Sequence, residues 1–173
     1  MLCILKNKAF KELLMKIVTL IKSVTIAATL VISSLSFAAD IDVNANANDL
    51  AIHGYDAVSY FSHSKATKGS NKYTATYKSA IYQFSNEENR ERFQANPEKF
   101  APQFGGFCAM GVALNRKLDT DPTAWKIVEG KLYLNLNKAV QKKWLSDVPG
   151  HLETANRVWS GIEGVSIAQL DAE

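Results

Sequence analysis

Two stretches of alternating apolar and polar residues, each interrupted by a two-residue turn, limit the folds open to this chain. Residues 73–84 have the sequence YTATYKSAIYQF, with Lys78-Ser79 at the centre. Residues 124–135 have the sequence AWKIVEGKLYLN, with Glu129-Gly130 at the centre. A period of two is typical of a strand with one buried face, and two such runs joined by a short turn predict a β-hairpin. The sequence therefore predicts two antiparallel hairpins.

Helix signals follow each hairpin. Ser85 and Glu88 have the spacing of a capping box, which predicts a helix over about 86–95, and Asn96-Pro97 predicts another short turn. Asn137 is suited to cap a helix over 138–146. A final helix is predicted after Pro149 from apolar residues at helical spacing, which are Leu152, Ala155, Val158, Trp159 and Ile162.

One further strand is expected at Ala57–Phe61, AVSYF. The order of these elements predicts an α+β fold, in which a small antiparallel sheet of hairpins packs with short helices and the C-terminal part is helical.

The N-terminal region has the pattern of an export signal. Lysines precede the apolar run 24–32, and Ser36-Phe37-Ala38 places small residues before a cleavage point. Residues 1–38 are therefore predicted to be a signal peptide, with Met15 as an alternative start because the leader then has the usual length. The mature chain is expected in the periplasm or secreted, with no stable membrane anchor after cleavage.

Removal of this leader changes the charge of the chain. The whole sequence has 20 Lys and Arg against 17 Asp and Glu, but five of these basic residues and only one acidic residue lie in the leader. The mature part has 15 basic and 16 acidic residues. A nucleic-acid-binding surface needs a clustered basic excess, so no nucleic-acid partner is predicted.

The remaining chain divides into three parts. Residues 39–49 are rich in Asn, Asp and Ala and are expected to be a flexible lead-in. Residues 50–164 contain the predicted elements and form one domain, and residues 165–173 are expected to be a disordered tail.

Three segments of this domain together resemble the YHS domain family, in its exported single-domain form. They are GYDAVSYF (54–61), YKSAIYQFSNEENRERFQANPEKFAPQFGGFCAMGVA (77–113) and DPTAWKIVEGKLYLNLNKAVQKKW (121–144). Some YHS-type domains are linked to heavy-metal handling, particularly of copper. Those domains have cysteines where this chain has Ser59, Ser85 and Asn89.

The candidate ligands for a soft metal are therefore few. Cys108 is the one cysteine of the predicted mature chain, and a copper site is predicted from Cys108, Met110 and His53. An alternative is that Cys108 packs in the core as a small apolar side chain. A third is that it is a reactive thiol in a redox auxiliary.

Three acidic residues have alternatives of their own. Asp56, with Tyr55, is either a polar pair at a pocket rim or a turn former before the strand expected at Ala57–Phe61. Asp119 and Asp121, in LDTDP, have the spacing of a turn and lack the rhythm of a calcium loop.

No catalytic motif is present, so no enzyme activity is predicted. The sequence indicates an exported, non-enzymatic YHS-like binding module. A transition metal such as copper is its first candidate ligand, and a structural or protein-interaction domain is the alternative.

Overall fold

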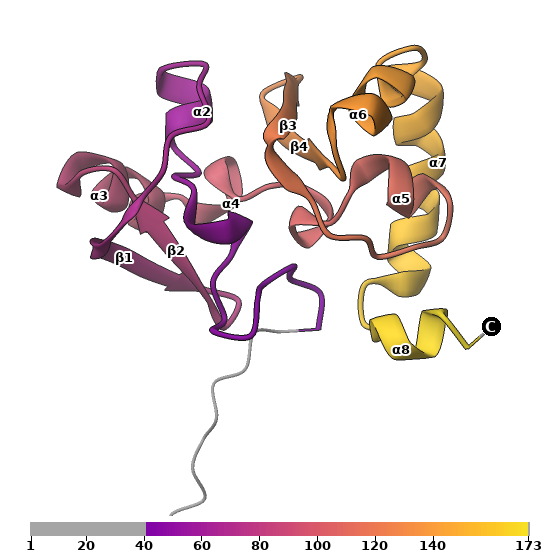
Figure 1. The fold of residues 1–173 in the computed structure, drawn as a ribbon, viewed down its shortest axis with the longest axis horizontal. Helices are drawn as coiled ribbons and strands as arrows, with labels where there is room; N and C mark the ends of the chain where they lie inside the picture. Colours follow the sequence, from indigo (N-terminus) through magenta and orange to yellow (C-terminus); the bar gives the residue numbers. More distant parts are fainter. Residues whose placement is uncertain (1–40, 173) are drawn as a thin grey trace, which may run out of the picture. The chain divides into compact units, whose positions relative to one another are not determined.

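The computed structural model describes residues 41–172, and Figure 1 shows how their elements follow one another. The predicted signal peptide, 1–38, lies outside the described residues. In chain order the elements are η1 (Ile52–Gly54), α2 (Ser59–Ser62), β1 (Ser70–Tyr77), β2 (Ala80–Phe84), α3 (Glu87–Ala95), α4 (Pro97–Phe100), η2 (Phe104–Gly106), α5 (Ala109–Ala113), β3 (Asp121–Val128), β4 (Lys131–Asn135), α6 (Lys138–Trp144), α7 (Val148–Ile162) and α8 (Ile167–Leu170). Over this described range, no helix combines the length and the hydropathy needed to cross a membrane.

Both predicted hairpins are present, so the α+β fold is confirmed. Strands β1 and β2 pair antiparallel across Lys78-Ser79, and β3 and β4 pair across Glu129-Gly130. All four turn residues have positive φ angles. This backbone twist matches the right-handed twist of the flanking strands, which is why short hairpin turns adopt it.

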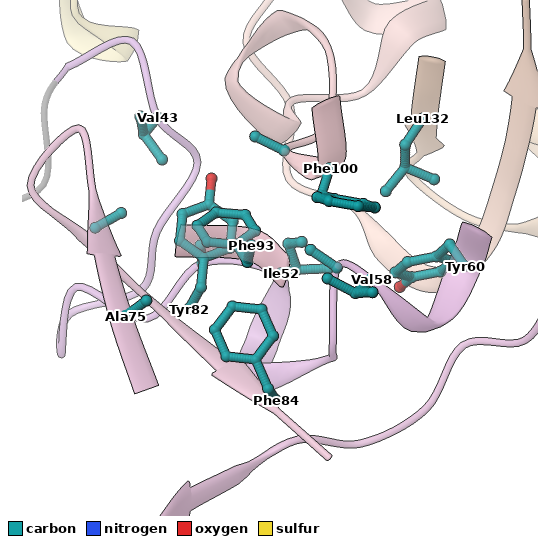
Figure 2. Close-up of a cluster of buried hydrophobic side chains, with 14 of the residues drawn as sticks. Val43, Ile52, Val58, Tyr60, Ala75, Tyr82, Phe84, Phe93, Phe100 and Leu132 are labelled. Atoms are coloured by element: carbon teal, nitrogen blue, oxygen red, sulfur yellow. The ribbon is translucent and has the colours of Figure 1, made fainter. Parts of the chain in front are cut away.

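Two hydrophobic cores lie on opposite sides of β4. The first core consists of Val43, Ala51, Ile52, Ala57, Val58, Tyr60, Ala75, Ala80, Tyr82, Phe84, Phe93, Phe100, Ala101, Leu132 and Leu134, and Figure 2 shows most of it. The second core consists of Phe104, Phe107, Cys108, Ala109, Met110, Val112, Tyr133, Trp144, Ala155 and Ile162.

Strand β4 contributes to both cores because successive side chains of a strand point to opposite faces. Leu132 and Leu134 enter the first core, whereas Tyr133 enters the second. Only Lys131, at the start of the strand, is exposed. The strand is thus buried on both faces.

The helices begin where short polar side chains accept backbone N–H groups. Asn86, Asn96, Asn137 and Asp147 each cap the helix that follows them. The predicted cap at Asn137 is confirmed, and the short turn predicted at Asn96-Pro97 is present as α4. The predicted capping box at Ser85 is wrong, since Asn86 accepts the Asn89 amide while Ser85 binds another group.

The segment predicted as a strand at Ala57–Phe61 is a turn followed by helix α2. Asp56 explains the difference, because its Oδ1 accepts the amides of Val58 and Ser59 at 2.9 and 3.2 Å. A carboxylate that accepts these two amides caps a turn and prevents their use in a sheet. The apolar residues Ala57, Val58 and Tyr60 still reach the first core.

The ends of the described chain are packed against the domain, in contrast to the flexible lead-in and disordered tail expected from the sequence. Val43 is buried in the first core, and the Asn44 amide donates to the Gly105 carbonyl at 2.8 Å. At the other end, Ser166 caps α8, whose Leu170 packs against the second core.

Lys117 joins these two ends. Its ammonium donates to the carbonyls of Ile41, Glu163 and Val165 at 3.0, 2.6 and 2.8 Å. Local composition could not reveal these contacts, because each joins segments that are distant in sequence.

We predict that the close approach of Gly105 to residue 42 is required for stability. Gly105 has a φ of 60°, and a Cβ there would lie 1.7 Å from the Asp42 carbonyl oxygen. Gly130 also has a positive φ, 73°, but a Cβ there would meet nothing within 4 Å. We expect Gly130→Ala to lower the free energy of unfolding by about 1 kcal/mol through backbone strain alone.

Gly105→Ala should lower the free energy of unfolding by at least about 2 kcal/mol more than Gly130→Ala does, because the backbone at Asp42, beside the first core, must also move. Urea denaturation of the two variants provides the measurement. Equal losses for the two would show that the approach to Asp42 is unimportant.

Candidate functional site

Cys108 lies in the second core, and no part of it is exposed to solvent. It is the N-cap residue of α5, where its Sγ accepts the Gly111 amide at 3.3 Å. The Leu136 amide also donates to this sulfur, at 3.2 Å. The sulfur therefore serves as a hydrogen-bond acceptor that fixes the start of α5 beside the end of β4.

The three predicted copper ligands do not share one pocket. Cys108 and Met110 belong to the second core, and Met110 is 7% exposed. His53, with 39% of its side chain exposed, lines a solvent-facing pocket that includes neither of them. Across residues 41–172 no group of three or more His, Cys, Asp or Glu side chains could hold a metal ion.

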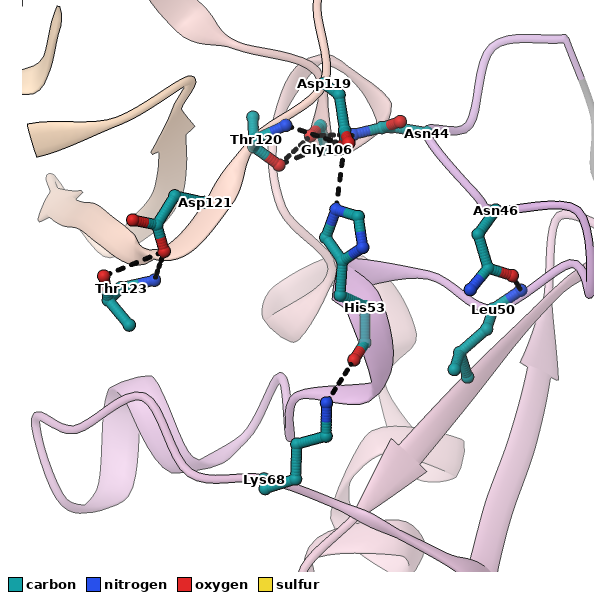
Figure 3. A network of polar contacts seen from close by, with 10 residues as sticks. All are labelled: Asn44, Asn46, Leu50, His53, Lys68, Gly106, Asp119, Thr120, Asp121 and Thr123. Carbon is teal, nitrogen blue, oxygen red and sulfur yellow. Dashed lines mark hydrogen bonds and ion pairs between the residues drawn. The ribbon is translucent and has the colours of Figure 1, made fainter.

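His53 is held by contacts at both its backbone and its ring. It lies in η1, where Ile52, His53 and Gly54 all have positive φ angles, of 50°, 49° and 75°. Lys68 donates to its carbonyl at 2.9 Å, and its Nε2 lies 2.9 Å from Asp119 Oδ1, as Figure 3 shows. Left-handed conformations are costly for residues other than glycine and persist only where the surroundings hold them. The imidazole orientation is thus fixed by the fold.

One oxygen of Asp119, Oδ1, is the hydrogen-bond partner of three groups. Besides His53, Asn44 Nδ2 donates to Asp119 Oδ1 at 2.9 Å, and the Thr120 amide donates at 2.7 Å. Burial opposes ionisation of this carboxyl, but the hydrogen bonds from Asn44, Thr120 and His53 outweigh it and lower the pKa of Asp119 below its ordinary value. Asp119 is therefore ionised at neutral pH.

The shallow pocket beside this pair contains further polar and apolar groups. It is lined by His53, Asp119, Thr120, Asp121, Pro122 and Leu136. Cys108 lies directly behind it, since the backbone of Leu136 binds the sulfur while Leu136 itself lines the pocket. Carboxylates over an apolar floor are suited to the cationic head and aliphatic stem of a basic side chain.

Asp56 forms a second polar cluster, which is enclosed in the fold. The residue is fully buried, and its Oδ2 accepts the Ser85 amide at 2.9 Å, the Ser85 hydroxyl at 2.6 Å and Asn89 Nδ2 at 2.6 Å. Together with the two amides on Oδ1, this carboxylate accepts five hydrogen bonds. Asp56 is thus the turn former of the two sequence-based alternatives, and it also ties α2 to the start of α3.

The cluster includes Ser59, Ser85 and Asn89, the three positions at which the resemblance to metal-linked domains would place cysteines. Ser85 and Asn89 bind Asp56 Oδ2, while Ser59 donates its hydroxyl to the carbonyls of Asp56 and Lys65. The fold therefore brings these three residues around one carboxylate. In this chain the three side chains belong to a network in which their polar groups have hydrogen-bond partners.

The sequence did not identify Asn44 or Asp119 as site residues. Asn44 was assigned to the flexible lead-in, and Asp119 was treated only as a turn residue. Their pairing with His53 joins residues 44, 53 and 119, and no spacing rule relates three such distant positions.

No protein-family model, no curated protein and no solved structure matches the chain.

We predict that the network around Asp56 is a major source of stability. Asp56→Asn keeps the side-chain shape but places an amide N–H group against the donors that now bind the carboxylate. Since each buried donor left unpaired costs about 1–3 kcal/mol, we expect a loss of at least about 3 kcal/mol in the free energy of unfolding.

The matched control is Asp171→Asn, at an exposed position, which should change stability by less than about 0.5 kcal/mol. Urea denaturation of both variants measures the difference. If the free energies of unfolding of the two variants differ by less than about 1 kcal/mol, Asp56 does not have this role.

We further predict a small, pH-dependent contribution from Asp119. Its folded-state pKa is lowered from 3.8, so its stabilising contribution is complete above this ordinary value and is lost as the pH falls through the lowered one. Asp119→Asn should cost about 0.2–1 kcal/mol at pH 7, because the pair is partly exposed.

The difference between wild type and Asp119→Asn should disappear in acid. Urea denaturation at a series of pH values from 7 to below 3 is the measurement, with the exposed Asp171→Asn as the control. A difference that stays constant over this range would contradict the assignment.

Proposed function

We propose that the mature chain is an exported, non-enzymatic YHS-like domain that acts by binding a protein partner, and that its cysteine is structural. The observation that carries the proposal is the environment of Cys108. The residue has no exposed surface, and its sulfur already accepts two backbone amides, from Gly111 and Leu136.

Copper binding by Cys108 would disrupt this arrangement. The sulfur has no exposed surface, so a metal or an alkylating reagent could reach it only if the packing of the second core opened. The His53–Asp119 pair does not itself oppose a metal, because it uses only Nε2 and leaves Nδ1 as a second ligand atom. The burial of the sulfur therefore favours the core alternative over both the copper site and the reactive thiol.

The surface that supports a partner-binding role is the pocket around His53 and Asp119. Asp119 and Asp121 supply negative charge there, and Pro122 and Leu136 supply apolar surface. Leu136 follows the buried end of β4 and is 39% exposed, so it places apolar surface beside the two carboxylates. A lysine or arginine of a partner protein has the matching chemistry.

We expect Cys108→Ala to lower stability without changing metal uptake. The substitution removes the cap of α5 and leaves a small cavity, so the free energy of unfolding should fall by about 1–3 kcal/mol. Cys108→Ser retains an acceptor and should lose less. Val112→Ala, at another fully buried position in the same core, is the control for a cavity without loss of a cap.

Two further measurements separate the alternatives. Alkylation of the native thiol should be slow and should become fast on addition of denaturant. Cu(I) titration of wild type and Cys108→Ala should give the same uptake. Stoichiometric uptake that is lost in Cys108→Ala would restore the copper site, and rapid alkylation of the folded protein would restore the reactive thiol.

A further inference from the structure

A short segment near the start of the described chain, residues 41–44, connects the pocket around His53 with the rest of the fold. We call this segment the latch. It passes along the backbone of η2, where the Asn44 amide donates to the Gly105 carbonyl at 2.8 Å. A Cβ at Gly105 would lie 1.7 Å from the Asp42 carbonyl oxygen, so the two backbones are in direct contact.

The side chain of Asn44 extends from the latch to the carboxylate of the pocket. Its Nδ2 donates to Asp119 Oδ1 at 2.9 Å and to the Gly106 carbonyl at 3.2 Å, and it lies 3.4 Å from Thr120 Oγ1, as Figure 3 shows. Burial raises the pKa of Asp119, and the hydrogen bond from Asn44 is the strongest of the contacts that lower it. Asn44 is thus a principal partner of the charged group at the pocket.

The contacts on Asp119 leave one of its oxygens for a ligand. Asn44, the Thr120 amide and His53 all share Oδ1, and within residues 41–172 no hydrogen bond involves Oδ2. The Asp119 side chain is 60% exposed, so a ligand can reach it. Because the two oxygens belong to one rigid group, the donors on Oδ1 also fix the direction of Oδ2, the acceptor that a lysine or arginine would meet.

The latch has few of the contacts that resist opening. Val43 is its one buried apolar side chain, whereas Ile41 is 48% exposed. Polar contacts supply the rest, since Lys117 donates to the Ile41 carbonyl at 3.0 Å and Lys78 donates to the Asp42 carboxylate at 2.8 Å. Segments with few buried apolar contacts open at a lower free energy than the whole domain unfolds. The latch can therefore open while the two cores remain folded.

Opening of the latch changes the pocket without removing any residue from its lining. The pocket is lined by residues 53, 119–122 and 136, and none of them belongs to the latch. An open latch takes Asn44 away from Asp119, whose carboxylate then keeps only the contacts from Thr120 and His53 and turns more freely. A ligand that needs a fixed Oδ2 binds the closed state better, and by linkage its binding also favours closure.

We propose that the latch regulates the affinity of the pocket around His53, with Asn44 as the positioning residue. The pocket binds a cationic side chain when the latch is closed, and binding in turn holds the latch closed. The role of the latch rests on the proposed function, since this cationic side chain is the one assigned there to a partner protein. If the latch served for packing alone, its opening would leave the affinity unchanged.

An NMR titration of the folded protein with Nα-acetyl-lysine N-methylamide tests the pocket itself. The Nε-acetylated form of the same compound is the uncharged control. The charged probe should shift the amide signals of Thr120 and Asp121, and the control should bind at least about threefold more weakly. Equal binding of the two compounds, or no binding of the charged probe to the wild type, would overturn the partner surface and the latch together.

Asn44→Ala tests the positioning residue. It should weaken binding of the charged probe about three- to tenfold and raise the pKa of Asp119 toward 3.8, as read from its carboxyl-carbon NMR signal. Asn48→Ala, at an exposed position, should change neither. Unchanged or tighter binding in Asn44→Ala, or an unmoved pKa of Asp119, would overturn the role of the latch while the partner surface stands.

Val43→Asp opens the latch from a residue that does not line the pocket, because a carboxylate is costly at a position only 7% exposed. It should weaken probe binding at least as much as Asn44→Ala does. Ala47→Asp adds the same charge at an exposed neighbouring position and should not weaken it. Gly105→Ala is the second opening variant if Val43→Asp does not fold, and wild-type affinity in the folded variant would contradict the coupling.

Hydrogen exchange of the wild type measures the same coupling in the reverse direction. A saturating concentration of the charged probe should slow exchange of the Asn44 amide several-fold, because binding favours the closed latch. The uncharged control compound should slow it less. An exchange rate that the charged probe leaves unchanged would show that binding does not close the latch.

Discussion

Strand β4 is the element on which the rest of the domain depends, because it is buried on both faces. A strand alternates its side chains, so Leu132 and Leu134 complete the first core while Tyr133 completes the second. Neither core is complete without this strand. Asn135, the last residue of β4, is also fully buried. The amide of the next residue, Leu136, donates to the sulfur of Cys108. The position of the cysteine thus follows from the position of β4.

Polar groups fix the geometry around these cores, and each does so by accepting backbone or side-chain donors. Asp56 accepts five hydrogen bonds inside the fold, while Asp119 accepts three at the surface. The difference in solvent access separates their roles. Asp56 has no free access to a ligand and stabilises the turn before α2, whereas Asp119 faces a pocket and can meet one. A buried carboxylate whose oxygens already accept protein donors is structural, whereas an exposed carboxylate beside a histidine can still contact a ligand.

The two pockets share one backbone feature. Each is lined by part of a three-residue segment with positive φ, Ile52–Gly54 at the His53 pocket and Phe104–Gly106 at a cavity of about 290 Å³ that Tyr77 and Trp159 also line. In each segment a non-glycine residue is held in a strained conformation by tertiary contacts. These segments reverse the chain abruptly, which lets His53 reach Asp119 and lets Phe104 contribute to both a core and a cavity wall.

The sequence by itself determined the hairpins, the helices that follow them and hence the α+β class, because alternation, turn residues and helical spacing act over a few positions. It placed α2 wrongly as a strand, since it could not show that Asp56 accepts the amides that a strand would use. It could not show that residues 41–49 and α8 pack against the domain, because the partners of Val43, Lys117 and Leu170 lie far along the chain. The tertiary structure alone decided that Cys108 caps a helix in the core and that His53 pairs with Asp119. Both results depend on contacts between distant segments, and a local pattern carries no information about such contacts.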